Sequence, residues 1–324
     1  METSCYADRQ AVKACVVFSF CSASLLLLNK LIMHAMKDHA MPSFISTLQF
    51  AASAITALVL MVQDWVPRDP FEWRKVKPYI VYVSMFVTTI YCNFKALQYA
   101  NVETLIVARS CVPCVVALLE FGCLGRTLPS PKSWLAMVVM VTGAVGYVKT
   151  DRQFEMDGIA AYTWVILYFV VISFEMALGK YIVGPQLGFA SMWGPVLYTN
   201  ALSMPPMMLI GLSTGEQGNL CQTVWTTSLL VLVLMSCVVG VAISFFGFRA
   251  RSLVSATCFT VLGVANKMAT VIVNTLMWDE HATAFGIASL FVCLLGAAAY
   301  QQSPMRPEQS GVLLPSTAPA AAPH

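Results

Sequence analysis

Ten runs of mostly apolar residues, joined by short polar segments, fill most of the chain. A helix needs roughly 20 such residues to cross the hydrocarbon core of a bilayer. Because 58% of the residues are hydrophobic and only 11% are charged, a soluble domain of this size could not bury the apolar surface. The sequence therefore predicts an all-α membrane protein. Its ten transmembrane helices are expected at residues 11–36, 42–62, 78–98, 103–125, 131–149, 158–183, 190–213, 224–248, 254–277 and 282–302.

Basic residues in the connections predict the orientation, since Lys and Arg are enriched in cytosolic loops. With both termini in the cytosol, the far side carries Lys37, Lys149 and Arg152. The cytosolic side then carries Arg9, Lys13, Arg68, Arg74, Lys75, Lys77, Arg126, Lys132, Arg249, Arg251 and Arg306. We expect residues 1–10 to be a cytosolic N-terminus. Residues 303–324 are expected to be a disordered cytosolic tail, because they are rich in Pro and Ala.

The two halves of the chain resemble each other. At an offset of 153 residues, GAVGY at 143–147 falls on GAAAY at 296–300, and both segments end a run. At an offset of 150, Lys30 in LNKLI falls on Lys180 in LGKYI. An odd number of spans per repeat forces the two copies into opposite orientations, as in many secondary transporters. The sequence thus predicts two inverted five-helix repeats. They cover residues 11–149 and 158–302.

Charged residues inside the apolar runs indicate the kind of ligand. A lysine in the middle of a bilayer costs roughly 2.5–3.5 kcal/mol unless it meets a partner or a cavity. The acidic residues well inside the runs are Glu120 and Glu175, and Glu175 precedes Lys180 by five positions. The basic residues are more numerous, namely Lys30, Lys95, Arg109, Lys180 and Lys267. This excess predicts an anionic substrate such as a phosphate or a carboxylate, whereas lysine–carboxylate pairs between helices are the structural alternative.

Two runs carry further polar residues. In the ninth, Gly263 lies one turn before Asn266 and Lys267, so a ligand could approach the backbone there. In the seventh, Thr199 and Asn200 are adjacent. An Asn amide both donates and accepts hydrogen bonds, as recognition of a base requires. Hydrogen bonds between helices could also account for these groups.

These motifs resemble those of nucleotide-sugar transporters of the drug/metabolite transporter superfamily, in the GDP-sugar branch. That branch carries Phe-Tyr-Asn-Asn in the seventh span and Gly-Ala-Leu-Asn-Lys in the ninth. This chain has Leu197-Tyr198-Thr199-Asn200 and Gly263-Val264-Ala265-Asn266-Lys267 at these places. Further segments resemble the GDP-fucose transporters of the plant Golgi, and they lie at 100–104, 143–148, 243–248, 259–267, 278–283 and 300–303.

The resemblance implies a Golgi antiporter that exchanges a cytosolic GDP-sugar, GDP-fucose first of all, for luminal GMP. It also implies that Tyr198 and Asn200 contact guanine, whereas residues of the ninth-span motif hold the ribose, diphosphate and sugar. Thr199 departs from the family's Asn and offers a hydroxyl in place of an amide. Charge placement adds three basic residues to the site. The candidate substrate-binding residues are Tyr198, Thr199, Asn200, Gly263, Ala265, Asn266, Lys267, Lys30, Lys180 and Arg109.

Several alternatives stay open at this point. The carrier could transport GDP-mannose or several GDP-sugars, or it could be an organic-phosphate translocator. An enzyme would need paired acid and base groups, and a receptor or scaffold would need larger loops; the sequence favours neither. It predicts no metal, cofactor or nucleic-acid partner. The expected partners are a GDP-sugar, GMP and the lipid bilayer, and a homodimer is a possible assembly.

Overall fold

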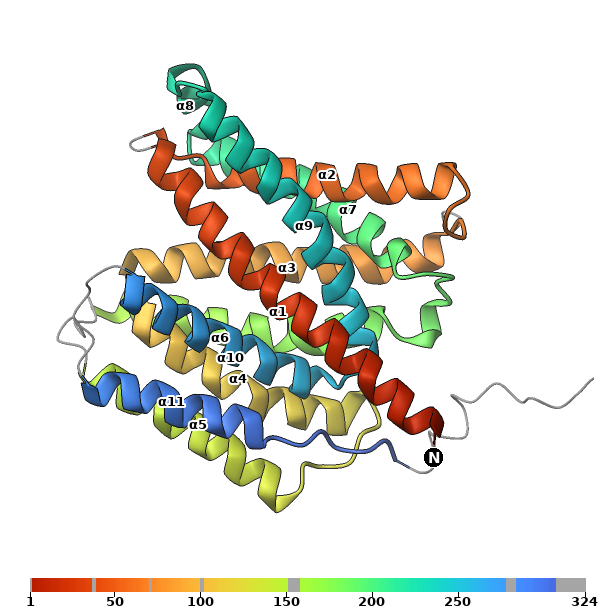
Figure 1. Cartoon of the computed structure of the whole chain (residues 1–324), viewed down its shortest axis with the longest axis vertical. Coiled ribbons are helices and arrows are strands. Elements are labelled where there is room, and N and C mark those ends of the chain that lie inside the picture. Colours follow the sequence, from red (N-terminus) through yellow and green to blue (C-terminus); the bar gives the residue numbers. More distant parts are fainter. Residues whose placement is uncertain are drawn as a thin grey trace, which may run out of the picture.

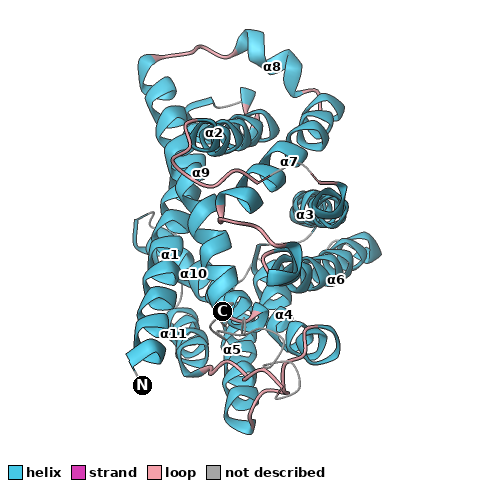
Figure 2. Ribbon diagram, turned by 90° about the vertical axis from the view of Figure 1, so that its right-hand side faces the viewer, coloured by secondary structure: helices cyan, strands magenta, loops and turns pink. Residues whose placement is uncertain are grey.

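The computed structural model describes residues 2–36, 39–69, 72–99, 102–150, 158–277 and 284–306, which form a bundle of helices (Figures 1 and 2). Ten long helices run through it, and one short helix, α8, caps one end. The helices are α1 (Glu2–Met36), α2 (Pro42–Val62), α3 (Trp73–Tyr99), α4 (Val102–Cys123), α5 (Pro131–Thr150), α6 (Gly158–Ile182), α7 (Trp193–Ser213), α8 (Glu216–Gln222), α9 (Thr227–Leu253), α10 (Ala256–Met277) and α11 (Ala284–Ala299).

Most helix boundaries agree with the predicted runs, but three helices are longer. The first helix begins at Glu2, so residues 2–10 continue α1 instead of forming a separate segment. Helix α3 begins at Trp73, five residues before the expected start. Helix α9 continues to Leu253, past the expected end at residue 248. Charged residues interrupt the apolar pattern in these extra turns, although the backbone remains helical there.

Partners for these charges explain why the extra turns are stable. Lys75, in the first turn of α3, is buried, and its Nζ lies 3.5 Å from Asp69 and 3.8 Å from Glu72. Arg251, in the last turn of α9, forms an ion pair with Glu175 of α6 at 3.2 Å. An apolar pattern ends at such residues, but a helix can continue where another element supplies the opposite charge.

Length and composition identify this chain as a membrane protein. Within the described residues, four helical segments are long and apolar enough to cross a membrane, and they are Arg9–Met36, Pro42–Val62, Thr163–Ile182 and Thr227–Leu253. The apolar part of α11, Phe285–Ala299, is shorter. The other long helices carry more polar residues, several of which face the interior cavity described below.

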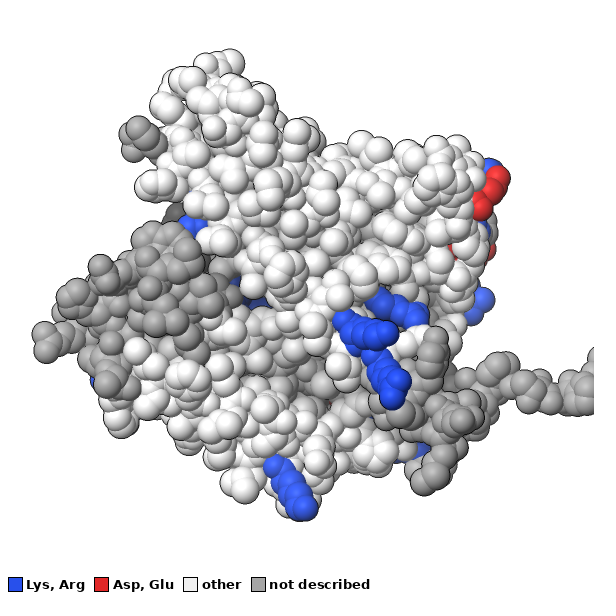
Figure 3. Space-filling model, in the orientation of Figure 1, with Lys and Arg blue, Asp and Glu red and all other residues white. Residues whose placement is uncertain are grey.

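The long helices pass back and forth between the two ends of the bundle (Figure 1). The chain leaves α11 at the same end of the bundle as its N-terminus, whereas α8 lies at the other end. Side-by-side pairs hold the bundle together, namely α1 with α9, α2 with α7, α3 with α6, and α5 with α11. The face drawn in Figure 3 shows few charged side chains, and the Lys and Arg visible there lie mostly toward the end with the N-terminus.

The start of the expected tail contacts the α4–α5 connection. Met305 forms an antiparallel bridge with Arg126 in the α4–α5 connection. The Thr127 N–H donates to the Pro304 carbonyl at 3.1 Å, and the Arg306 N–H donates to the Gly125 carbonyl at 3.0 Å. The first residues of the expected tail therefore have backbone partners in the α4–α5 connection. Residues 307–324 lie outside the described part of the chain.

Two glycines let α5 and α11 approach closely. A Cβ added at Gly143 would lie 2.5 Å from the Cys293 nitrogen, and one added at Gly296 would lie 2.6 Å from the Met140 nitrogen. Small residues commonly allow such contact between membrane helices. Because backbone atoms form the opposing surface, no side chain can move aside to admit a methyl group.

Gly296→Ala should therefore destabilise the α5–α11 pair by about 1–3 kcal/mol, as overpacking does elsewhere. Thermal unfolding in detergent would show a lower midpoint than for the unchanged chain. Gly122→Ala is the matched control, because a Cβ there would meet nothing within 4 Å. Equal midpoints for the two variants would contradict the close packing described here.

Candidate functional site

A cavity of about 590 Å³ lies inside the bundle, and described residues of eight helices line it. Helices α1, α2, α3, α4, α6, α7, α9 and α10 contribute to the lining, whereas α5 and α11 do not. The volume is in the range of pockets that hold small-molecule ligands, roughly 300–1,000 Å³. The lining combines aromatic rings with a small number of charged and amide groups.

One part of the cavity is cationic. Lys267 and Gly263 line it from α10, and Arg109 lines it from α4. The Arg109 Nη1 donates to the Tyr168 hydroxyl at 2.9 Å, and its Nη2 lies 3.7 Å from the place of a Cβ at Gly263. Two like charges that share a poorly solvated cavity repel each other. An anionic ligand would relieve that repulsion.

A second polar part of the lining comes from α7. The Asn200 Nδ2 donates to the Val196 carbonyl at 2.8 Å and lies 3.5 Å from the Ser244 hydroxyl of α9. The Thr199 hydroxyl is buried and has no hydrogen-bond partner among the described residues. Buried polar groups are rarely left without a partner, so this hydroxyl is suited to meet a polar ligand atom.

Two of the candidate residues in these motifs, Tyr198 and Ala265, do not line the cavity. Tyr198 is buried against Tyr79 and Phe189, with ring centroids 5.4 and 5.5 Å away. Successive helical residues are rotated by about 100°, so Tyr198 turns away where Thr199 turns inward. Ala265 is likewise absent from the lining, although Asn266 and Lys267 belong to it.

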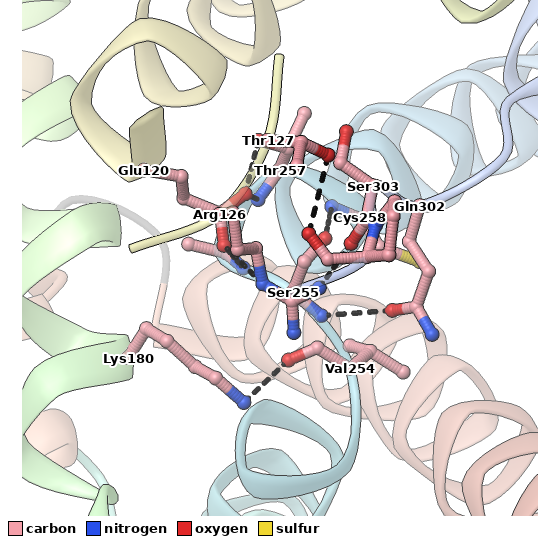
Figure 4. Close-up of polar contacts among 12 residues, drawn as sticks. Glu120, Arg126, Thr127, Lys180, Val254, Ser255, Thr257, Cys258, Gln302 and Ser303 are labelled. Carbon is pink, nitrogen blue, oxygen red and sulfur yellow. Dashed lines mark hydrogen bonds and ion pairs between the residues drawn. The ribbon is translucent and has the colours of Figure 1, made fainter. Parts of the chain in front are cut away.

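The lysines related by the internal repeat also lie outside the lining. The Lys180 Nζ donates to the carbonyls of Arg251, Ser252 and Val254 at 2.7, 3.0 and 2.6 Å. It thus satisfies carbonyls at the end of α9 that have no partner within the helix, and Figure 4 shows the bond to Val254. Lys30 is exposed on α1.

The lining includes an ion pair that the sequence did not predict. Arg251 and Glu175 both face the cavity, whereas the sequence placed Arg251 in a loop and Glu175 within reach of Lys180. The guanidinium lies over the Phe259 ring, 4.6 Å from its centroid. A Cβ at Gly179 would collide with Arg251. Because Gly179 has no side chain, the Arg251 guanidinium can lie against α6.

Glu120 serves the fold and not the cavity. Its carboxylate accepts hydrogen bonds from the Ala256 and Thr257 N–H groups at 2.7 and 3.0 Å and from the Thr257 hydroxyl. Arg126 lies 3.3 Å from it, and Figure 4 shows this group around the start of α10. A carboxylate at a helix N-terminus is favourable because the free N–H groups carry partial positive charge. Glu120 thereby holds the helix that carries Gly263 and Lys267.

Comparison with known proteins identifies the family. The chain is 37% identical to GDP-fucose transporter 1 of Arabidopsis thaliana over 297 residues, which are 88% of this chain and 84% of that protein. This chain belongs to the GDP-sugar transporters. It is also 36% identical to the GDP-mannose transporter GONST3 of the same plant, over 92% of this chain and 80% of that protein. Because these relatives are transporters, they support a carrier and not an enzyme.

Two broader comparisons concern the family and the fold. Residues 10–148 of the transporter match the EamA-like transporter family. One solved crystal structure shares the fold with a TM-score of 0.63 at 16% identity, and the match covers 89% of this chain and 96% of that one. The resemblance read from the motifs of the seventh and ninth spans is thus confirmed at the level of the family.

The two repeat-related lysines should differ in their effect on stability. Lys180→Met would leave three carbonyls at the end of α9 without their donor, which should cost about 2 kcal/mol or more. Lys30→Met alters an exposed side chain and should cost less than about 0.5 kcal/mol. Thermal unfolding of both variants in detergent measures the difference. A Lys180→Met midpoint equal to that of Lys30→Met would contradict the capping role.

Proposed function

We propose that this transporter exchanges cytosolic GDP-fucose for luminal GMP across the Golgi membrane by alternating access. The observation that carries the proposal is a cavity lined by two cations, Arg109 of α4 and Lys267 of α10. The chain that contains this cavity belongs to the GDP-sugar transporter family. Both substrates carry phosphate, and both would compensate these two cations. One site can therefore serve either nucleotide.

The cavity lining suits the parts of a nucleotide. Arg109 and Lys267 would hold phosphate oxygens, because charge-assisted hydrogen bonds to phosphate are among the stronger polar contacts. Gly263 presents backbone without a side chain beside them. The Asn266 amide lies one position away on α10 and could bond to a hydroxyl of the ribose or sugar. Thr199 and Asn200 supply polar groups from α7.

Two inverted five-helix repeats would provide the alternating access. In such repeats, α1, α2, α3, α4 and α5 would correspond to α6, α7, α9, α10 and α11. The contact of α1 with α9 would then correspond to the contact of α6 with α3. Both contacts are present. At the offset of 153, Gly143 faces Cys293 while Gly296 faces Met140, which is the same contact with the roles exchanged. This reciprocity supports ten membrane-spanning helices in two repeats that rock around a central site.

We further propose that both termini face the cytosol. The chain begins and leaves α11 at one end of the bundle, and the connections at that end carry Arg68, Lys75 and Arg126. Helix α8, at the other end, carries Glu216. Basic residues are enriched in cytosolic loops, so this arrangement supports the orientation predicted from the sequence.

Two exposed cysteines can test the orientation. Cys123 ends α4 at the proposed cytosolic side, and Cys221 lies in α8 at the proposed luminal side. In variants that retain one of these cysteines alone, a membrane-impermeant maleimide should label Cys123 in sealed Golgi vesicles. Cys221 should react only after the vesicles are permeabilised. The opposite pattern would place the termini in the lumen.

GDP-mannose is the second candidate substrate, because the relative GONST3, named as a GDP-mannose transporter, is almost as similar to this chain. The two sugars differ in hydroxyl positions and in one oxygen. The cavity residues near the diphosphate would be common to both substrates. The choice between these sugars therefore depends on contacts at the sugar end.

Uptake into proteoliposomes should separate the two candidates. With vesicles preloaded with GMP, we expect labelled GDP-fucose to enter faster than labelled GDP-mannose, and vesicles without GMP to take up little of either. A higher rate for GDP-mannose would favour the second candidate. Equal uptake into empty and GMP-loaded vesicles would contradict exchange.

Lys267→Ala should abolish GMP-dependent uptake, because it removes one of two cations that compensate the phosphate charge. Lys132→Ala is the control, since Lys132 is exposed at the start of α5 and outside the cavity. The protein should still elute as a folded carrier in detergent, and GMP should no longer raise its unfolding midpoint. Exchange equal to that of the control would remove Lys267 from the proposed site.

A further inference from the structure

The two ends of the cavity differ in burial. At the end of the bundle where α1, α3 and α10 begin, the lining side chains are at most 6% exposed, and they are Tyr82 of α3, Glu175 of α6, Phe248 of α9 and Phe259 of α10. Toward the end with α8, the lining residue Leu26 of α1 is 38% exposed. Lys267, eight residues beyond Phe259 on α10, is partly exposed. Among the described residues, the lining is thus shut at the end with the N-terminus and more exposed toward α8.

An ion pair lies in the shut part of the cavity. The Arg251 Nη2 donates to Glu175 Oε1 at 3.2 Å, and the two side chains are 12% and 3% exposed. The guanidinium lies 4.6 Å from the centroid of the Phe259 ring and 5.8 Å from that of Tyr82. Its other face is against α6, where a Cβ at Gly179 would collide with it. The pair and the two rings thus join α9 to α6, α3 and α10 across one end of the cavity.

Further polar contacts close the same end outside the cavity. The Lys180 Nζ donates to the last carbonyls of α9. The Arg249 Nη2 donates to Gln10 Oε1 of α1 at 2.9 Å. None of these three side chains belongs to the described lining, whereas Glu175 and Arg251 both do. The ion pair is therefore the inner face of the closure, and it is the part that water or a ligand in the cavity would meet.

The internal repeat indicates how this closure would change. Helix α6 packs on α10, and its Met176 lies against the cluster that contains Phe259. If α1 corresponds to α6 and α4 to α10, the counterpart would be a contact of α1 with α4. Among the described residues, no contact of that extent joins α1 to α4. When inverted repeats exchange conformations, one end opens as the other closes, so the opposite state would separate α6 from α9 and α10.

A buried ion pair is suited to a contact that must break. Removing two charges from water costs free energy that their mutual attraction repays only in part. When α6 and α9 separate, water can solvate both charges again, so the separation costs little. An apolar contact of the same area would instead lose its full hydrophobic stabilisation on exposure. The pair between Glu175 and Arg251 can therefore hold one end shut without making that state permanent.

We propose that Glu175 and Arg251 form a latch that shuts the cavity at the end with the N-terminus, and that the transporter opens there by separating the two side chains. This inference rests on the proposed alternating access and names the contact that breaks during it. In the orientation proposed above, the latch faces the cytosol. Gly179 belongs to the latch, since its missing side chain lets Arg251 lie against α6.

The reactivity of a cysteine placed inside the cavity tests the latch. Ser22 lines the cavity on α1, one turn beyond Phe18, which packs on Phe259 at 4.9 Å. In Ser22→Cys, a membrane-impermeant maleimide is added to sealed vesicles, and peptide mapping reads the labelling at position 22. Exposed Cys123 ends α4 on the latch side. The vesicle orientation is chosen so that Cys123 reacts, which verifies that the reagent is on that side.

Position 22 should react slowly from the latch side in Ser22→Cys alone. Adding Glu175→Gln should raise the rate about tenfold or more, because it leaves Arg251 buried without its partner in the shut state only. Glu216→Gln is the matched control, since Glu216 is also a buried carboxylate but accepts from N–H groups at the start of α2, outside the cavity. It should leave the rate unchanged. No increase in Glu175→Gln, or an equal increase in Glu216→Gln, would overturn the latch.

A reversible bridge across the latch gives a second test should Glu175→Gln not fold. In the double variant Glu175→Cys, Arg251→Cys, a bifunctional methanethiosulfonate should join the two positions, and Glu175→Cys alone is the control that carries the reagent without a bridge. GMP exchange in proteoliposomes should be lost on bridging and return after reduction, while GMP still raises the unfolding midpoint of the bridged protein. The control should keep its exchange after the same treatment.

Exchange that survives complete bridging would overturn the latch. Equal loss of exchange in the control would also count against it, because the reagent alone would then explain the effect. If the unchanged transporter exchanges no GMP, the proposed function fails instead, and labelling at position 22, which needs no nucleotide, still decides whether the latch exists.

Discussion

The junction between α9 and α10 depends on two charges supplied by other helices. Lys180 of α6 donates to the last carbonyls of α9, and Glu120 of α4 accepts from the first N–H groups of α10. Each charge has the sign that the partial charge of its helix end requires. In an environment poor in water these backbone groups would otherwise be unsatisfied, at a cost of several kcal/mol each. The junction positions the cavity residues of both helices.

Consequences of this junction extend along both helices. Arg251 occupies the last turn of α9 and Phe259 the first turn of α10, so the junction sets their stacking distance of 4.6 Å. About one and two turns further along α10, Gly263 and Lys267 line the cavity, as does Arg109 of α4. The packing of α5 against α11 through Gly143 and Gly296 lies outside the cavity. The structure thus separates the residues that line the cavity from those that hold α5 and α11 together.

The site could be predicted only in part. Of the ten candidates, the cavity is lined by Thr199, Asn200, Gly263, Asn266, Lys267 and Arg109. Polarity within an apolar run was a sufficient signal for these residues. The same signal included Lys180 and Tyr198, which meet partners in the fold instead. This signal did not identify Arg251. A charged residue near the end of an apolar run is read as part of a loop, unless it is known that Glu175 lies beside it in the fold.

The sequence by itself determined a membrane bundle, the family and most helix boundaries, because these depend on local composition, on the length of apolar runs and on short motifs. The fold decided which of the buried charges face the cavity and which cap helix ends. A lysine inside a membrane helix needs a partner in either case. The residues next to it in the sequence do not indicate whether that partner is a set of backbone carbonyls or a ligand. Only the packing of α6 against α9, with Gly179 leaving room for Arg251, settled that Lys180 serves the helix end and that Arg251 and Glu175 line the cavity.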